Sequence, residues 1–201
     1  MRSVQDYFFK KAKKENYLAR SVYKLREINQ RFHLFSSNNF ILDLGAAPGS
    51  WAQYILSKIS PHEKVIAIDQ HPLKIQEKQV IFIQKNIFDI SVNEFRQWLR
   101  QNHYPVEFDG IVSDLAPQTS GVKQLDNQHS LELAQKSFDL AQNLLSAGGY
   151  FVCKIFESPD AHFLFHQIKT CFQKSKIFKP QASRKESREF YIVAQNFLHN
   201  Q

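Results

Sequence analysis

Short apolar segments alternate with amphipathic segments along most of this chain of 201 residues. Apolar runs bounded by polar or turn residues are typical of buried strands, and they cover residues 40–44, 64–68, 80–83, 108–113 and 150–156. Two further strands are expected at 176–179 and 189–194. Apolar side chains follow a helical period in residues 17–32, 50–59, 91–102, 127–146 and 160–172.

This order of elements predicts an α/β fold. Buried strands that alternate with helices form a parallel sheet with helices on both faces. The last two strands have no long helix between them, so we expect an antiparallel, hairpin-like edge. Gly148 and Gly149 are expected to end the helix before the fifth strand. The prediction is a Rossmann-like, doubly wound domain with a seven-stranded, mostly parallel sheet over residues 36–201, preceded by a basic extension and helix over residues 1–35.

The distribution of charge says more than the net charge of +7 does. Residues 1–31 hold nine Lys or Arg against three Asp or Glu, and residues 169–190 hold seven against two. Residues 32–168 hold ten Lys or Arg against fourteen Asp or Glu. Solubility alone does not require basic residues to be concentrated in two segments and acidic residues in the segment between them. Two basic segments that flank a mildly acidic core are typical of a protein that binds a polyanion such as a nucleic acid.

Composition and patterning argue against several classes of protein. No uncharged stretch is long enough to span a bilayer, and no apolar segment follows the basic N-terminus, so neither a membrane protein nor a secreted one is expected. Cys153 and Cys171 are expected to be buried thiols in the reducing cytoplasm. His162 and His166 have zinc-ligand spacing, but the glutamate of a zincin motif is missing, so no metal site is expected. A monomer is expected at this length.

The loop Gly45-Ala46-Ala47-Pro48-Gly49 follows the first strand, and small residues there let the backbone approach a ligand. Asp69 ends the second strand, twenty residues after Gly49, where a carboxylate can accept both hydroxyls of a ribose. The loop lacks the lysine of a P-loop and the third glycine of a dinucleotide motif. A nucleoside cofactor without phosphates is therefore favoured over the pyrophosphate cofactor of a nicotinamide dehydrogenase. S-adenosylmethionine is such a compound.

Two polar residues stand at the carboxyl ends of predicted strands, where open α/β sheets bind their ligands. Asp114 closes the fourth strand, and Lys154 interrupts the apolar fifth strand. A lysine flanked by Cys153 and Ile155 must be paired or lose its charge. The pair is therefore a candidate catalytic site, and on the residues alone a purely structural ion pair is the alternative.

Five short motifs stand along the chain, namely Ser21-Val22-Tyr23-Lys24-Leu25, Leu42-Asp43-Leu44-Gly45-Ala46-Ala47-Pro48-Gly49-Ser50-Trp51, Ser113-Asp114-Leu115-Ala116-Pro117, Val152-Cys153-Lys154-Ile155-Phe156 and Ser187-Arg188-Glu189-Phe190-Tyr191. Together they resemble the motifs of one family, the FtsJ/RrmJ (RlmE-type) ribosomal RNA large subunit 2′-O-ribose methyltransferases. The motifs follow one another in the order seen in that family, and the resemblance runs from about residue 6 to residue 197.

The resemblance implies a class I methyltransferase that uses S-adenosylmethionine and a Lys-Asp-Lys-Glu tetrad, here Lys24, Asp114, Lys154 and Glu189. Lys154 would take the proton of a ribose hydroxyl as the hydroxyl attacks the methyl group. Lys24 would hold the substrate, Asp114 would orient Lys154, and Glu189 would orient the two lysines. Cofactor contacts are implied for Gly45, Ala46, Pro48, Gly49, Ser50, Trp51, Asp69, Asn86 and Asp114.

Asn86 and Trp51 differ from the other implied cofactor positions. The family commonly has Asp where this chain has Asn86, although an amide can still form hydrogen bonds with adenine. Trp51 opens the helix after the loop, where it would pack either beside the cofactor or simply within the core.

The implied acceptor is the 2′-hydroxyl of a uridine in 23S ribosomal RNA, within the large ribosomal subunit. Ser183 could add a hydrogen bond to the RNA. Contacts to RNA phosphates are expected from Arg20, Lys24, Arg31, Arg184, Lys185 and Arg188.

Two alternatives stay open, a transfer RNA anticodon-loop 2′-O-methyltransferase and a non-catalytic RNA-binding factor in ribosome assembly. The second is disfavoured because a binding protein has no use for a lysine inside an apolar strand. A messenger-cap methyltransferase is less expected, since so short a chain shows no separate cap-binding segment.

Overall fold

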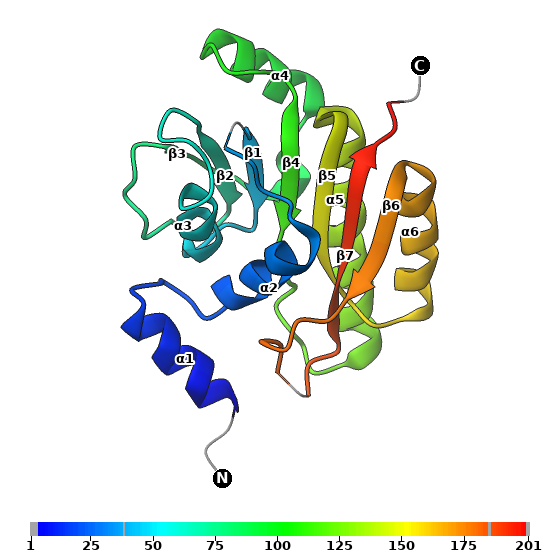
Figure 1. Ribbon diagram of the computed structural model, residues 1–201. Coiled ribbons are helices and arrows are strands. Elements are labelled where there is room, and N and C mark those ends of the chain that lie inside the picture. Colours follow the sequence, from blue (N-terminus) through cyan, green and yellow to red (C-terminus); the bar gives the residue numbers. More distant parts are fainter. Residues whose placement is uncertain (1–3, 38, 185, 200–201) are drawn as a thin grey trace.

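The computed structural model describes residues 4–37, 39–184 and 186–199, and it contains one twisted sheet with helices on both of its faces (Figure 1). The order of strands in the sheet is β3-β2-β1-β4-β5-β7-β6, and only β7 runs antiparallel to its neighbours. The predicted seven-stranded, mostly parallel sheet is confirmed. The strands are β1 (Ile41–Leu44), β2 (Val65–Asp69), β3 (Val80–Gln84), β4 (Phe108–Ser113), β5 (Leu145–Phe156), β6 (Phe172–Phe178) and β7 (Glu189–Phe197).

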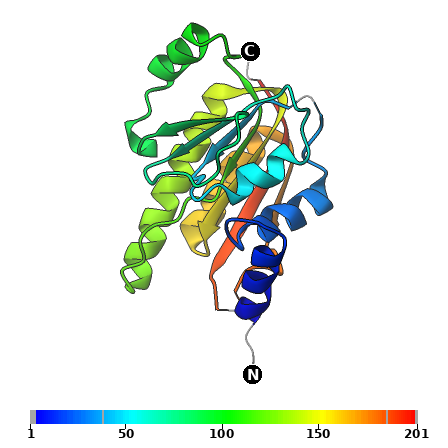
Figure 2. The same cartoon turned by 90° about the vertical axis from the view of Figure 1, so that its left-hand side faces the viewer.

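Two separate cores hold the helices against the sheet, and Figure 2 shows the layers from the side. One core joins α2 and α3 to the sheet, and α1 lies against α2 on the same side. The other core lies under α4, α5 and α6. The helices are α1 (Val4–Lys14), α2 (Val22–Phe32), α3 (Ser50–Leu56), α4 (Val92–Gln101), α5 (Lys123–Leu144), α6 (Pro159–Thr170) and the short 3₁₀ helix η1 (Ile87–Asp89).

No helix in the described part of the chain is both long enough and apolar enough to cross a membrane.

The last two strands form the expected antiparallel, hairpin-like pair at one edge of the sheet. The antiparallel strand β7 lies inside the sheet between β5 and β6, so β6 alone forms the edge. Most side chains of β7 are buried, whereas β6 exposes Lys174 and Lys176. The more apolar strand therefore takes the inner place, and the strand with alternating lysines faces solvent along the open edge.

The N-terminal helix also differs from its predicted bounds. The expected helix over 17–32 begins only at Val22, and a separate helix, α1, precedes it. Asn16 has a positive φ of 59° and ends α1. The connecting segment is fixed instead by the amide of Leu18, which donates to Gln53 of α3 at 2.9 Å.

The transition from α5 to β5 comes earlier than predicted. The helix ends at Leu144, and β5 follows at once from Leu145, so Gly148 and Gly149 lie within the strand segment and do not end the helix. Gly148 has a φ of +79°, which is compatible with an irregular strand. The pairing of β4 with β5 is irregular at the same place, where its register shifts between Phe108 and Gly110.

One strand carries a buried carboxylate without a hydrogen bond. Asp43 of β1 is fully buried between Leu42 and Leu44, and within the described chain neither of its oxygens has a hydrogen-bond partner. Burial, together with the negative charges of Asp114 and Asp69, raises the pKa of Asp43 well above its usual range. The charged form of Asp43 therefore destabilises the folded protein.

We expect Asp43→Asn to stabilise the ligand-free protein, by roughly 1–3 kcal/mol near pH 8. Because the pKa of Asp43 is higher in the folded state than in the unfolded state, its contribution to stability falls as pH rises from about 4 through the folded pKa. The gain should therefore shrink towards about pH 4. Urea unfolding of both proteins across this range measures it, and a gain that is equal at every pH would contradict the assignment.

Candidate active site

A cleft of about 690 Å³ opens beyond the carboxyl ends of β1, β2 and β4. Its size is within the range of small-molecule sites, and its position is the one at which open α/β sheets bind ligands. Residues that line it include Gly45, Ala47, Asp69, Gln70, His71, Asn86, Phe88, Asp114, Leu115, Gln118 and His129.

Asp69 is held rigidly at one side of this cleft. One carboxylate oxygen accepts the amide of Ala47 at 2.9 Å, and the other accepts the amide of His71 at 2.8 Å. Each oxygen retains a lone pair that can accept a ligand hydroxyl. The neighbouring Gly45 has a φ of +75°, and a Cβ there would lie 2.9 Å from Leu115, so this position requires glycine. These contacts place a fixed carboxylate beside a closely packed loop.

Asn86 and Phe88 form the far wall of the cleft. The side-chain oxygen of Asn86 accepts the amide of Phe88 at 3.0 Å and so caps η1. Phe88 lines the cleft with 51% of its surface exposed. An exposed aromatic ring in such a wall can stack on a planar base. No pattern in the sequence indicates Phe88. Ile87 and Phe88 are both apolar, and their order in the chain does not reveal that Ile87 is buried and Phe88 exposed.

Five residues expected at the cofactor do not line the cleft, namely Ala46, Pro48, Gly49, Ser50 and Trp51. Two of them connect α3 to the start of α2. The hydroxyls of Ser50 and Ser21 lie 3.0 Å apart, and the indole nitrogen of Trp51 donates to the carbonyl of Ser21 at 3.0 Å. Trp51 is buried and packs beside Tyr191. Of the two positions expected for Trp51, beside the cofactor or within the core, this is the one within the core.

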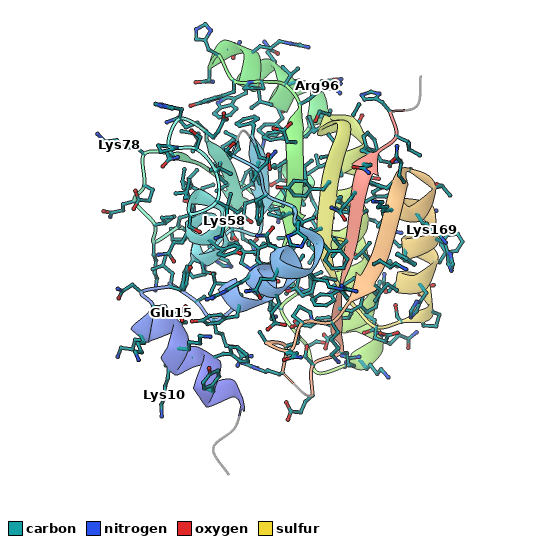
Figure 3. All side chains as sticks on the ribbon, viewed as in Figure 1. Lys10, Glu15, Lys58, Lys78, Arg96 and Lys169 are labelled. Carbon is teal, nitrogen blue, oxygen red and sulfur yellow. The ribbon has the colours of Figure 1, made fainter. Side chains whose placement is uncertain are left out.

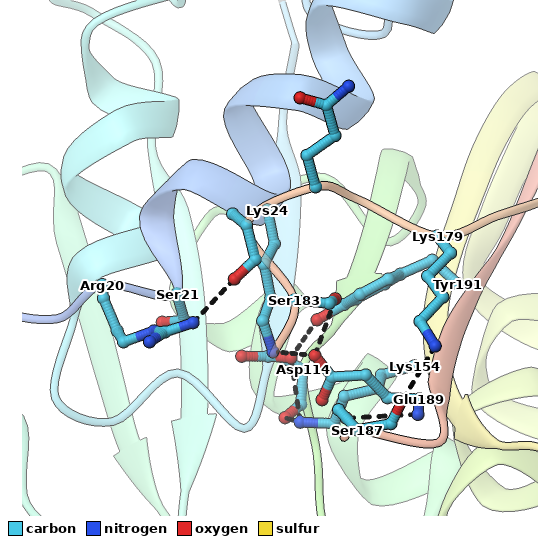
Figure 4. Close-up of polar contacts among 12 residues, drawn as sticks. Arg20, Ser21, Lys24, Asp114, Lys154, Lys179, Ser183, Ser187, Glu189 and Tyr191 are labelled. Atoms are coloured by element: carbon cyan, nitrogen blue, oxygen red, sulfur yellow. Dashed lines mark hydrogen bonds and ion pairs between the residues drawn. The ribbon is translucent and has the colours of Figure 1, made fainter. Parts of the chain in front are cut away.

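The expected tetrad comes together next to the cleft (Figure 4). Lys154 donates to the backbone carbonyl of Asp114 and to its carboxylate, the latter at 2.9 Å. The hydroxyl of Tyr191 donates to the same carboxylate oxygen at 2.7 Å. Lys24 forms an ion pair with Glu189, which also accepts the hydroxyl of Ser183 at 2.9 Å. Among the described residues each lysine therefore has its own carboxylate, and the ion pair of Glu189 is with Lys24.

Strand register explains why residues so distant in the sequence meet. Ser113 pairs with Cys153 across β4 and β5, which puts Asp114 next to Lys154. Lys154 pairs with Tyr191 across β5 and β7. Directly opposed residues of neighbouring strands project from the same face of a sheet. Helix α2 then adds Lys24 from above that face (Figure 4).

Asp114 is the electrostatic centre of the group. Burial alone would raise its pKa, but the charges of Lys154 and Lys24 and the hydrogen bonds from Tyr191 and Lys154 outweigh burial and lower the pKa. Burial, with the negative charges of Asp114 and Glu189, raises the pKa of Tyr191 well above its usual range. Asp114 is therefore a permanent acceptor, and Tyr191 is a permanent donor.

The residues expected to contact RNA phosphates have different surroundings. Arg31 and Arg184 are exposed. Arg20 donates to the carbonyl of Ala182 at 2.7 Å, and Arg188 donates to the side-chain oxygen of Asn127 at 3.0 Å. Lys185 lies outside the described residues.

Ser183 was also expected at the RNA. It is buried and donates to Glu189, so it supports the tetrad rather than facing solvent.

Asp114 joins the two halves of the site, because it lines the cleft and holds Lys154. A ligand in the cleft and the amine of Lys154 would therefore lie on either side of one carboxylate. This arrangement suits transfer of a group from a bound nucleoside to a nucleophile placed beside Lys154.

Comparison with known proteins supports this interpretation. The model of the family described as FtsJ-like methyltransferase matches residues 17–197. A protein of Nitratidesulfovibrio vulgaris named Ribosomal RNA large subunit methyltransferase E is 42% identical over 194 residues, which are 96% of this chain and 93% of that protein. A protein of the same name from Bdellovibrio bacteriovorus is 38% identical over 189 residues, or 94% and 95% of the two chains.

A crystal structure described as a ribosomal RNA methyltransferase from Plasmodium falciparum superposes with a TM-score of 0.79 at 30% identity, covering 92% of this chain and all of that one. The family model covers nine-tenths of the sequence, and the relatives match over nearly their whole length. The chain belongs to the FtsJ-like methyltransferase family, and its methyl donor is S-adenosylmethionine.

Proposed function

We propose that this protein transfers a methyl group from S-adenosylmethionine to a ribose 2′-hydroxyl of large-subunit ribosomal RNA. The observation that carries the proposal is the position of Asp114, shared by the nucleoside cleft and by the lysine that would accept the proton. The names of the relatives support the choice of ribosomal RNA. By resemblance to the family, the proposal extends to a uridine of 23S RNA within the large subunit, methylated in the cytoplasm by a monomer.

The residues around the cleft suit this cofactor. Asp69 offers acceptors for two ribose hydroxyls, and Phe88 offers a stacking surface for adenine. The carboxylates of Asp69 and Asp114 both line the cleft, and their negative potential favours a cationic ligand. When bound, S-adenosylmethionine supplies a methyl group activated by a positively charged sulfur.

The contacts of Lys154 explain how it would act as a base. The ammonium of the Lys154–Asp114 ion pair must first release one proton to solvent, and the neutral amine that results has two N–H groups and one lone pair. Asp114 provides two acceptors to Lys154, its backbone carbonyl and its carboxylate. With both N–H groups engaged there, the lone pair is left to accept the proton of the ribose hydroxyl, which becomes the nucleophile. Lys24, fixed by Glu189, would hold the phosphate or the ribose of the acceptor.

Methyl transfer from labelled S-adenosylmethionine tests the function directly. The acceptors are isolated large subunits, free ribosomal RNA and transfer RNA from cells that lack the enzyme, followed by digestion to nucleosides. We expect label in a 2′-O-methyl nucleoside of the large subunit and a loss of about 10²–10⁴-fold in kcat for Lys154→Ala, because the base is gone. The control Lys78→Ala removes an exposed lysine on the β2–β3 connection (Figure 3) and should keep full activity.

Other outcomes of this assay would change the proposal in different ways. Label confined to transfer RNA would overturn the substrate and keep the chemistry. Cofactor binding without transfer to any acceptor would favour the non-catalytic RNA-binding alternative. Equal activity of Lys154→Ala and the wild type would remove Lys154 from the mechanism.

The hydrogen bond from Tyr191 to Asp114 yields a second prediction. Tyr191→Phe keeps the buried ring but removes a donor to a charged acceptor, an interaction worth about 1.5–3 kcal/mol. We expect kcat to fall by about tenfold or more, with little change in cofactor affinity. Steady-state kinetics and calorimetry with S-adenosylhomocysteine separate the two effects, and an unchanged kcat would show that Asp114 needs no support from Tyr191.

The exposed ring of Phe88 yields a third prediction. Loss of base stacking in Phe88→Ala should weaken the binding of S-adenosylhomocysteine by about tenfold. The matched control is Phe163→Ala on α6, whose ring is 66% exposed and lies outside the cleft. Calorimetry compares the two variants, and equal affinities would exclude Phe88 from the adenine site.

A further inference from the structure

Helix α2 holds the loop between β6 and β7 through a carboxylate that the mechanism above does not use. The two oxygens of Glu27 accept the amides of two consecutive residues, Gln181 at 2.6 Å and Ala182 at 3.0 Å. Successive backbone amides that converge on one anion form a compact binding site for it. The charge of the carboxylate strengthens both hydrogen bonds.

These two hydrogen bonds belong to a closed ring of contacts that returns to α2. Ala182 is followed by Ser183, whose buried hydroxyl donates to Glu189. Glu189 holds Lys24, which lies three residues before Glu27 on the same helix. Residues three apart on a helix are neighbours on its surface. One stretch of α2 therefore contacts both the start of this loop and the strand residue that follows it.

A carboxylate is needed at this junction because both partners are basic. The segment 1–31 carries nine Lys or Arg, and the segment 169–190 carries seven. The guanidinium of Arg20 contacts the same loop at the carbonyl of Ala182, and Arg184 follows two residues later. Without an anion between them, such segments repel one another. Loss of Glu27 would also leave the amide of Ala182, a fully buried residue, without its acceptor.

We propose that Glu27 is a positioning residue for methyl transfer, which fixes the β6–β7 loop so that Ser183 and Glu189 hold Lys24 in place. This inference rests on the proposed function of the site. Glu27 acts on Lys24 through the loop, not on the substrate. Removing its charge therefore lowers kcat and loosens a defined backbone segment, while the cofactor cleft on the other side of Asp114 is left intact.

The test compares Glu27→Gln with Glu15→Gln in the full-length protein. Glutamine has nearly the same shape, but one of its terminal groups is a donor and cannot accept an amide. In the described part of the chain the carboxylate of Glu15 contacts the side chains of Tyr23 and Arg26, so Glu15→Gln makes the same change of charge in the same basic region away from the β6–β7 loop. We expect kcat to fall by about tenfold for Glu27→Gln alone, with unchanged affinity for S-adenosylhomocysteine in both variants.

Hydrogen exchange gives a readout that does not depend on activity. The amides of Gln181 and Ala182 should exchange about tenfold faster or more in Glu27→Gln, while the amides of β1 and β4 keep their protection. Faster exchange throughout the protein would instead indicate a general loss of stability and would overturn the positioning role. If Glu27→Gln does not fold, Glu27→Asp, whose shorter carboxylate keeps the charge but cannot reach both amides, takes its place.

A double-mutant cycle with Ser183→Ala decides whether Glu27 acts through this loop. If it does, the double variant loses no more activity than the worse of the two single variants. The proposal would be overturned if the losses of the two single variants multiplied in the double variant. A kcat for Glu27→Gln equal to that of Glu15→Gln would also overturn it. Failure of the wild type to methylate any RNA would overturn the proposed function instead, and the exchange rates would still decide whether Glu27 anchors the loop.

Discussion

The ion pair between Lys154 and Asp114 is the contact around which this half of the molecule is arranged. Only 7% of Lys154 is exposed, and the residue lies in a strand whose neighbours along the chain are apolar. Taking such a charge out of water costs several kcal/mol unless good acceptors replace the water. Asp114 supplies two acceptors, and Tyr191 in turn supports Asp114. A lysine in this strand is therefore stable only when the ends of β4 and β7 lie beside it.

The inner position of β7 meets this requirement. Because β7 lies next to β5, Tyr191 faces Lys154, and Glu189 lies at the end of the same ladder, opposite Phe156. Had β7 formed the sheet edge, with β6 between it and β5, neither residue would reach the pair. The sheet order thus serves packing and chemistry together: the apolar strand is buried, and its polar end completes the tetrad.

Much of the fold and of the site follows from the sequence because the signals are local. Apolar runs reveal strands, and polar residues at strand ends indicate Asp114 and Lys154. Resemblance to the family adds Lys24 and Glu189 to the tetrad. The order of β6 and β7 in the sheet does not follow from the sequence, because the spacing of apolar residues does not specify which strand pairs with which. Side-chain partners are also hidden: Ser183 was expected to face RNA, yet it supports Glu189. The anchoring of Gln181 by Glu27 joins residues 154 positions apart, and no local pattern encodes such a contact.

The late place of β7 in the chain also shapes how the protein is made. β7 follows every other strand in sequence but lies between two of them, so β6 cannot join the sheet until β7 has been synthesised. Pairings of this kind between distant segments form slowly and leave strand edges open during synthesis. The tetrad is incomplete for the same period, because Glu189 belongs to the inserted strand. The residues that line the cleft therefore all precede β7 in the chain, and the four residues of the tetrad come together only when β7 closes the sheet.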